Sequence, residues 1–116
     1  MGELDRRAER ENETAAYWLL YCYEKNDPDW IALAEHVEAD LSVRDQIILR
    51  LRRKYRHRRG PYGWTEPTAK EYAEEVARLT GQTAAEVGTR HRNTLASWWN
   101  RIITYTVREA IRQKLL

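Results

Sequence analysis

Residues 68–103 decide the predicted fold; they read TAKEYAEEVARLTGQTAAEVGTRHRNTLASWWNRII. Two capping boxes begin helices in this stretch, one at Thr68 and one at Thr83. Gly81 lies between them and is typical of a helix C-terminus. From residue 87 to residue 103 apolar residues continue at helical spacing, so we expect one long second helix. The stretch predicts a supporting helix, a short turn and an outward helix, the layout of a helix-turn-helix. An ordinary αα-hairpin uses the same caps and glycine and stays open as the alternative.

The rest of the chain is also typical of helices. Residues 15–23 begin a first helix, and Asp27-Pro28 supplies an N-cap carboxylate and a first-turn proline for the next one. Ser42, three residues before an aspartate, resembles a further capping box. Residues 58–67, RRGPYGWTEP, contain the glycine and proline residues of a loop. We therefore predict an all-α fold of about five helices that ends in a long C-terminal helix.

Charge is distributed unevenly along the chain. Residues 1–40 contain 4 Lys and Arg against 11 Asp and Glu, whereas residues 41–116 contain 16 against 7. The formal net charge of +2 thus combines an acidic N-terminal segment with a basic remainder. We predict that residues 1–40 form an acidic helical extension that packs on the core, and that residues 41–116 form a basic helix-turn-helix domain. Such asymmetry is a reason to consider polyanions as partners.

The densest positive charge lies in residues 50–59, RLRRKYRHRR, here called the basic run, where seven of ten residues are Lys or Arg. That density favours a salt-dependent attraction to the phosphates of nucleic acid. The alternative interpretation is a solvated helix end, because cations near a helix C-terminus offset the macrodipole.

Composition and motifs argue against several classes of protein. With 116 residues the chain has the size of one domain, and no apolar run approaches the roughly 20 residues of a membrane span. The first six residues lack the basic-then-apolar order of a secretory signal, and the single cysteine, Cys22, cannot form an internal disulfide. We therefore expect the protein to reside in the reducing cytoplasm. No cysteine or second histidine lies at metal-ligand spacing from His36, His57 or His91, and no phosphate-binding loop, nucleophile elbow or zinc helix motif occurs. We therefore expect no catalysis, no cofactor and no metal.

A family resemblance begins at residues 41–52. Their sequence, LSVRDQIILRLR, resembles the opening helix of region four of bacterial RNA polymerase sigma factors. After the loop, the family's Thr-x-x-Glu-apolar-Ala segment is matched by Thr68, Glu71, Tyr72 and Ala73. Gly81 and Thr83 resemble its Gly-x-Ser turn. The places of its recognition helix, V-x-x-R-x-x-R-A-x-x-x-L, are taken by Val87, Arg90, Asn93, Thr94 and Trp98. The resemblance spans residues 41–103, a little over half of the chain.

This resemblance implies a module that binds the upstream promoter element in the major groove of double-stranded DNA and docks on the flap of the RNA polymerase β subunit. Sigma factors need a second region to open DNA, and residues 1–40 do not resemble that region. The resemblance therefore implies a stand-alone regulator of transcription rather than a complete sigma factor.

The sequence departs from the family pattern in two places. The loop at residues 58–67 is longer than the family's connector, and residues 77–80 add about one helical turn before the glycine.

Two sets of residues are the candidate contacts to DNA. Phosphate contacts are expected from the arginines of the basic run and of the second helix: Arg50, Arg52, Arg53, Arg56, Arg58, Arg59, Arg90 and Arg92. The outward face of the second helix is expected to comprise Ala84, Ala85, Gly88, Thr89 and Arg92, together with Thr83 at its start and Asn93 beside Arg92. Only Arg92 and Asn93 on that face have side chains long enough for base readout. We therefore expect the affinity to depend on phosphate contacts, with a modest sequence preference.

Two alternatives to DNA binding stay open. The face around Ala84 and Ala85 has few polar groups and favours a protein-interaction module that binds RNA polymerase, or mimics a sigma domain, without touching DNA. An apolar i, i+4 stripe could serve a homodimer through the C-terminal helix or pack against residues 1–40; it comprises Ile103, Val107, Ile111 and Leu115. In the loop, Tyr62 and Trp64 could stack on a base, but we expect both to pin the loop onto the core.

Overall fold

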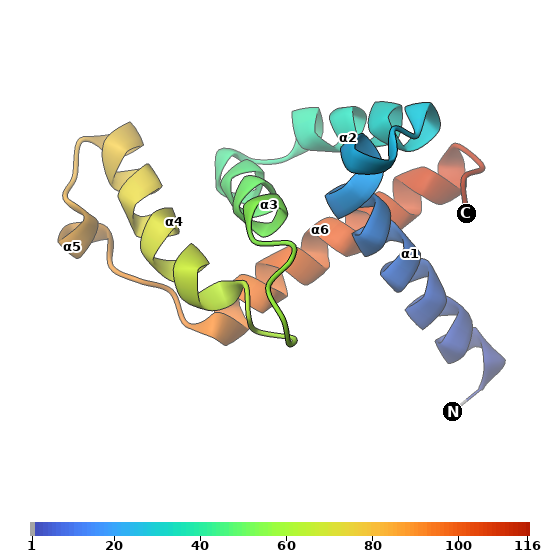
Figure 1. The fold of residues 1–116 in the computed structure, drawn as a ribbon, viewed down its shortest axis with the longest axis horizontal. Coiled ribbons are helices and arrows are strands. Elements are labelled where there is room, and N and C mark those ends of the chain that lie inside the picture. Colours follow the sequence, from blue (N-terminus) through green and yellow to red (C-terminus); the bar gives the residue numbers. More distant parts are fainter. Residues whose placement is uncertain (1) are drawn as a thin grey trace. The chain divides into compact units, whose positions relative to one another are not determined.

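The protein is all-α, as predicted. The computed structural model describes residues 2–116, the side chains of residues 3–5 excepted, and no strand occurs among them. The helices are α1 (Glu3–Lys25), α2 (Pro28–Asp40), α3 (Val43–Lys54), α4 (Thr65–Thr80), α5 (Ala84–Val87) and α6 (Arg92–Arg112) (Figure 1). Helix α6, of 21 residues, is the expected long C-terminal helix. None of the helices in the described part of the chain is long and apolar enough to cross a bilayer. Met1, part of the stretch inspected for a secretory signal, lies outside the described residues.

The helices form two compact units. The first comprises Met1–Leu41 together with Arg101–Leu116, and the second comprises Ser42–Asn100. Helix α6 contributes its residues 92–100 to the second unit and its remaining residues to the first. The charge pattern instead predicts residues 41–116 as one domain. That partition differs because the C-terminal part of α6 packs with the acidic N-terminal helices, for example through a 2.7 Å hydrogen bond from the Tyr105 hydroxyl to Asp40.

The first unit is built on the apolar faces of α1, α2 and the C-terminal part of α6. Its most buried side chains include Ala15, Leu19, Cys22, Leu33, Val37, Ile102, Thr106 and Ala110. Trp18 stacks on Trp30, with the ring planes 8° apart. Asp27 begins α2 as predicted, because its carboxylate accepts hydrogen bonds at 3.1 Å from the backbone N–H groups of the second and third helical residues. Each buried Leu or Ile stabilises such a core by about 1.5–3 kcal/mol.

Helix α1 is longer than predicted. It begins at Glu3, whereas the apolar pattern places its start at residue 15. Residues 3–14 are mostly Glu, Arg and Ala, which have high helix propensity but form no apolar stripe. Periodicity therefore missed a polar first half, of which residues 6–10 are exposed to solvent.

The second unit is centred on α3 and α4. Ser42 begins α3 as predicted, since its hydroxyl oxygen accepts a hydrogen bond at 3.2 Å from the Asp45 backbone N–H. Ile47, Ile48, Leu49 and Leu51 of this helix are buried, and Tyr55 at its C-terminal end is half-buried. The rest of the core comprises Trp64, Tyr72, Ala73, Leu95 and Trp99.

The start of α4 differs from the prediction. The helix begins at Thr65, before the expected cap at Thr68. Thr68 is buried and its hydroxyl donates a 2.6 Å hydrogen bond to the carbonyl oxygen of Trp64, so it is not an N-cap. Pro67 lies in the first turn, where a backbone N–H needs no acceptor within the helix, and the proline therefore does not delay the helix start.

The predicted continuous helix from Thr83 to residue 103 is wrong. The capping box at Thr83 is present, but α5 ends at Val87 after four residues. Gly88 then has φ 74° and ψ 159°, a conformation that is open essentially to glycine alone. Helix α6 begins at Arg92, and the backbone N–H of Asn93 in its first turn donates to the preceding histidine ring at 3.1 Å. Helix α4, the Gly81 turn and α5 thus keep the order of a helix-turn-helix, but the second helix is a single turn.

Candidate nucleic-acid interface

The second unit carries the excess positive charge of the protein. Ser42–Asn100 contains 12 Lys and Arg against 6 Asp and Glu, whereas the first unit contains 8 against 12. An attraction to polyanions is therefore a property of the second unit. The position of each cation in this unit decides which of them can reach a ligand.

Residues 55–64 connect α3 to α4 and are here called the arginine loop. Arg58 and Arg59 are exposed on it, and the Arg58 guanidinium lies 5.7 Å from the centre of the Tyr55 ring. The loop is tightly folded at Gly63, where a Cβ atom would lie 2.0 Å from the backbone carbonyl oxygen of Arg59. The arginine loop therefore presents two neighbouring cations on a backbone whose conformation requires glycine.

The end of this loop meets the segment before α6 and the start of that helix. A cavity of about 330 Å³ is lined there by Tyr62, Thr65, Glu66, Ala69, Arg90 and Arg92. Arg92 is exposed, and its guanidinium lies 5.0 Å from the centre of the Tyr62 ring. Arg90 is half-buried; its guanidinium lies 5.9 Å from the Tyr72 ring and donates to the Val87 carbonyl oxygen at 3.3 Å. Two of the predicted phosphate-binding arginines are thus brought beside the first turns of α4.

The two aromatic residues of the loop differ in burial. Trp64 is 3% exposed and packs in the core as predicted, with its ring 6.4 Å from that of Trp99. Tyr62 is 42% exposed, so the prediction that it pins the loop onto the core is wrong. Its ring instead lies against Arg92 at the surface.

Three arginines of the basic run are half-buried: Arg52, Arg53 and Arg56. The Arg52 guanidinium lies 5.3 Å from the Trp64 ring and 5.5 Å from the Trp99 ring, a cation–π arrangement over two core residues. Arg56 donates to the Arg53 carbonyl oxygen at 2.8 Å. These cations contact the protein itself, and less of each side chain faces solvent than in Arg58 and Arg59.

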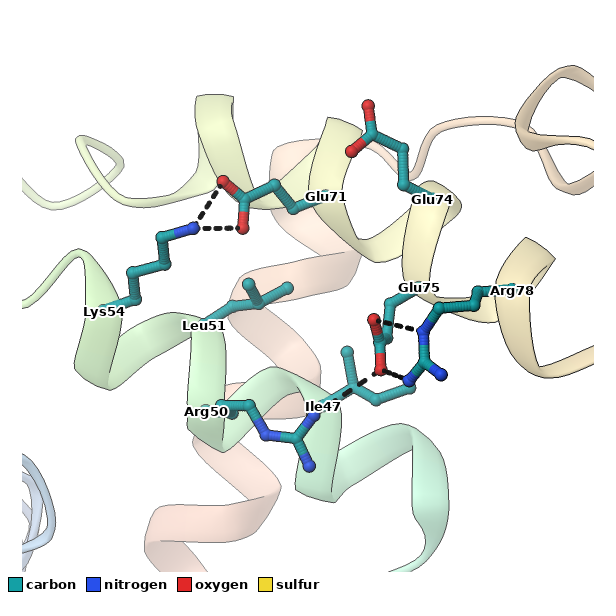
Figure 2. A pocket seen from close by; sticks show the side chains of 8 residues that line it. All are labelled: Ile47, Arg50, Leu51, Lys54, Glu71, Glu74, Glu75 and Arg78. Atoms are coloured by element: carbon teal, nitrogen blue, oxygen red, sulfur yellow. Dashed lines mark hydrogen bonds and ion pairs between the residues drawn. The ribbon is translucent and has the colours of Figure 1, made fainter.

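Lys54 is held by an acidic residue of α4. Its Nζ lies 3.0 Å from both carboxylate oxygens of Glu71 (Figure 2). The Tyr55 hydroxyl donates to the same carboxylate. The hydrogen bonds from Tyr55 and Lys54 lower the pKa of Glu71 below its ordinary value. The same hydrogen bonds to Glu71 raise the pKa of Lys54 and of Tyr55. This cluster fastens the end of α3 to α4.

Arg50 is also beside α4. Its guanidinium lies 3.6 Å from a carboxylate oxygen of Glu75, which Arg78 contacts as well. A cavity of about 500 Å³ between α3 and α4 is lined by Ile47, Arg50, Leu51, Lys54, Glu71, Glu74, Glu75 and Arg78 (Figure 2). Its lining has as many carboxylates as cations, so the cavity does not favour an anion. Arg50 is exposed as expected, but it lies beside Glu75, which it shares with Arg78.

The residues predicted to form the outward, base-reading face of the second helix lie in two separate places. Thr83, Ala84, Ala85, Thr89, Arg92 and Asn93 are all exposed, as a reading face requires. However, α5 follows the C-terminal end of α4, whereas Arg92 lies beside its first turns (Figure 1). The helix from Ala69 to Thr80 is about 16 Å long at the usual rise per residue. Residues 83–85 and residues 90–93 are separated because Gly88 ends the helix between them.

The C-terminal stripe offers little surface to a second copy. Ile103 is buried, and Val107 and Leu115 are half-buried in the first unit. Ile111, 49% exposed, is the one member of the stripe that is largely open to solvent. A homodimer through this stripe therefore has no continuous apolar face.

Sequence reasoning missed the acidic partners of the basic run. Arg50 and Lys54 are four residues apart on α3, and Glu71 and Glu75 are four residues apart on α4. Matched i, i+4 spacing of opposite charges on consecutive helices is the signal that could have identified these pairs. The contact between Tyr62 and Arg92 has no comparable signal, because a loop and a distant helix start form it.

No protein-family model matches the chain, and neither a curated protein nor a solved structure matches it. The likeness to sigma region four therefore stays an expectation that depends on the quoted residues.

Proposed function

We propose that the protein binds duplex DNA through the arginine loop and the start of α6, and that phosphate contacts supply most of the affinity. One observation carries the proposal. Arg58, Arg59 and Arg92 are exposed, and among the side chains that the structure describes no ion pair involves any of them. By contrast, Arg50 and Lys54 face carboxylates of α4.

Exposed arginines without acidic partners suit phosphate binding for two reasons. Each guanidinium can exchange water for a phosphate oxygen without breaking an internal ion pair, and its planar donors match phosphate geometry. Each phosphate contact also releases condensed counterions from DNA, so affinity falls as salt rises. The exposed Tyr62 ring beneath Arg92 adds a flat surface against which a sugar or base could lie.

Sequence preference is expected to be modest. Helix α5 is one turn long, and its exposed Ala84 and Ala85 have no hydrogen-bonding side chains. The hydroxyl of Thr83 is engaged with Glu86 in the capping box. Base readout would depend on Arg92 and Asn93, which are too few donors for a long recognition sequence.

The proposal is tested by titrating fluorescent duplexes of two unrelated sequences at about 50 and 200 mM salt. The double variant Arg58→Ala/Arg59→Ala is compared with Arg101→Ala/Arg108→Ala, which removes the same charge from exposed positions of the first unit. Each lost phosphate contact should reduce the slope of log K against log salt by about 0.9, so the loop variant should lose about 1.8 and the control little. Salt-independent binding, or an equal loss in both variants, would contradict the proposal.

A second candidate function is protein binding, with RNA polymerase as the partner that the sigma resemblance implies. It is favoured by Leu79, which is 52% exposed at the end of α4. The exposed Ala84 and Ala85 follow shortly after it in the chain. Capture of DNA-free core RNA polymerase that is lost in Leu79→Ser but kept in Arg58→Ala/Arg59→Ala would favour this role over DNA binding.

A further inference from the structure

We propose that His36, Asp40 and Glu109 form a binding site for a divalent transition-metal ion in the first unit. Their candidate ligand atoms, one imidazole nitrogen and two carboxylate oxygens, all lie within 4.8 Å of one another. His36 Nε2 is 3.8 Å from Asp40 Oδ2 and 3.7 Å from Glu109 Oε1. Imidazole nitrogen and carboxylate oxygen are both ligand types of Zn²⁺ and related ions, whereas Mg²⁺ and Ca²⁺ favour oxygen alone.

The fold brings these donors together from two helices. His36 and Asp40 are four residues apart on α2, which places them on one face of that helix. Glu109 approaches from α6 and is only 6% exposed, in contrast to the exposed His36 and Asp40. A buried carboxylate requires compensating positive charge. Arg112, whose Nε lies 3.6 Å from Glu109 Oε2, supplies part of it, and a bound cation would add to it.

The distances fit a metal ion better than direct hydrogen bonds. Separations of 3.7 and 3.8 Å are too long for a hydrogen bond between His36 and either carboxylate. In a tetrahedral zinc site with bonds of about 2.0–2.1 Å, neighbouring ligand atoms are about 3.3 Å apart. Because the three donor atoms lie within 4.8 Å of one another, inward movements of up to about 0.8 Å per side chain would bring them to zinc-binding geometry.

Two further residues hold the carboxylates in place. The Tyr105 hydroxyl donates a 2.7 Å hydrogen bond to Asp40 Oδ2. Arg112 Nε lies 3.6 Å from Glu109 Oε2, the oxygen that does not face His36. Outer contacts of this kind orient metal ligands and support their affinity. Tyr105 and Arg112 are accordingly positioning residues rather than ligands.

The site would have three protein ligands, so at least one coordination position stays open to water. Because His36 and Asp40 are exposed, the ion would exchange with solvent. A metal bound here would join α2 to α6 and stabilise the first unit, since it binds the folded state alone. This inference is independent of DNA binding, because every residue involved belongs to the first unit.

The test is a Zn²⁺ titration of the untagged full chain, in competition with a chromophoric chelator, together with thermal unfolding at each Zn²⁺ concentration. We expect one saturable site and a rise in Tm with Zn²⁺. His36→Ala and Glu109→Gln should each weaken Zn²⁺ binding by at least about tenfold and abolish the rise in Tm. His57→Ala is the matched control, because it removes an exposed imidazole from the second unit.

His36→Ala keeps the test decisive even if loss of the buried Glu109 charge disturbs folding. His36 is exposed, and in this variant Glu109 keeps its contact with Arg112. Far-UV circular dichroism checks that each variant is folded. Zn²⁺ affinity in folded His36→Ala equal to that of the unmodified chain would overturn the proposal. An equal loss in His57→Ala, or the absence of saturable binding, would overturn it as well.

Discussion

The guanidinium of Arg92 lies 5.0 Å from the centre of the Tyr62 ring. This contact joins the first residue of α6 to the arginine loop, and such a cation–π pair at an exposed site is worth about 0.5–1 kcal/mol. It holds a cation without neutralising it, because the ring has no net charge. Arg92 is therefore both positioned and available to an anion.

Replacing Arg92 with alanine should weaken binding to all duplexes and lower the salt slope by about 0.9, as expected for one phosphate contact. Arg92→Lys keeps the charge and should restore most of the slope, but it loses the planar donors and therefore part of the affinity. Arg108→Ala, an exposed position of the first unit, is the control. The measurement is a fluorescence-anisotropy titration at several salt concentrations. An unchanged slope in Arg92→Ala would remove Arg92 from the interface.

Glu71 should make the stability of the second unit sensitive to acid. Hydrogen bonds from Tyr55 and Lys54 lower the pKa of Glu71 in the folded state. Ionised Glu71 therefore stabilises the fold fully above the pKa of an unfolded glutamate, about 4.3. This stabilisation is lost as the pH falls through the lowered pKa. Glu71→Gln should therefore lower the free energy of unfolding at pH 7 and lessen its further decline below roughly pH 4.5.

The comparison is made by urea unfolding at neutral and acidic pH. Glu74→Gln is the control, because Glu74 is exposed and forms no ion pair within the described part of the chain (Figure 2). If Glu74→Gln and Glu71→Gln changed the acid dependence equally, the Tyr55–Lys54–Glu71 cluster would not be its cause.

Gly88 lies at the break between α5 and α6, and two further glycines with less demanding backbone conformations allow a graded comparison. Gly88, at φ 74° and ψ 159°, occupies a region that side chains avoid, so Gly88→Ala should destabilise the protein by about 1–3 kcal/mol. Gly81 is in the left-handed helical region, where alanine should cost about 1–2 kcal/mol. Gly2→Ala, at an extended backbone position with no neighbour within 4 Å, should change little.

Urea unfolding measures these differences, and far-UV circular dichroism reports helix content. A more stable and more helical Gly88→Ala variant would mean that the continuous helix predicted from residue 83 to residue 103 can form after all.

Local signals identified several helix starts, because a cap involves residues only a few positions apart. Asp27, Ser42 and Thr83 each accept the expected backbone hydrogen bonds. The same signal failed at Thr68, where an earlier start was compatible with Pro67 in the first turn. Short-range patterns therefore predict that a helix exists better than where it begins.

The break at Gly88 could not be decided from periodicity. Apolar spacing continues across it, and one glycine costs a helix only about 1 kcal/mol. Burial of Leu95 and Trp99 in the core, a long-range effect, is larger than that penalty and fixes where α6 begins. The candidate site was divided for the same reason, since residues 83–85 and 90–93 no longer share a helix.

Charge density alone also could not separate the arginines by role. Arg52 lies over two tryptophan rings, whereas Arg58 and Arg59, a few residues later, are exposed on the arginine loop. The difference arises because α3 ends at Lys54 and the chain then turns away from the core. Only the fold distinguishes a cation that packs inside the unit from one that is open to a ligand.

The last prediction concerns the backbone that presents Arg58 and Arg59. At Gly63 an added Cβ would lie 2.0 Å from the Arg59 carbonyl oxygen, and this neighbour is backbone, so it cannot move aside without reshaping the loop. Gly63→Ala should therefore destabilise the second unit by about 1–3 kcal/mol and displace both arginines, which lowers DNA affinity in the folded variant. Pro61→Ala, exposed in the same loop, is the control and should change both quantities less. Urea unfolding and duplex titration at low salt measure the two effects on the same samples. A Gly63→Ala variant that is destabilised but keeps normal DNA affinity would show that this turn does not position the arginines.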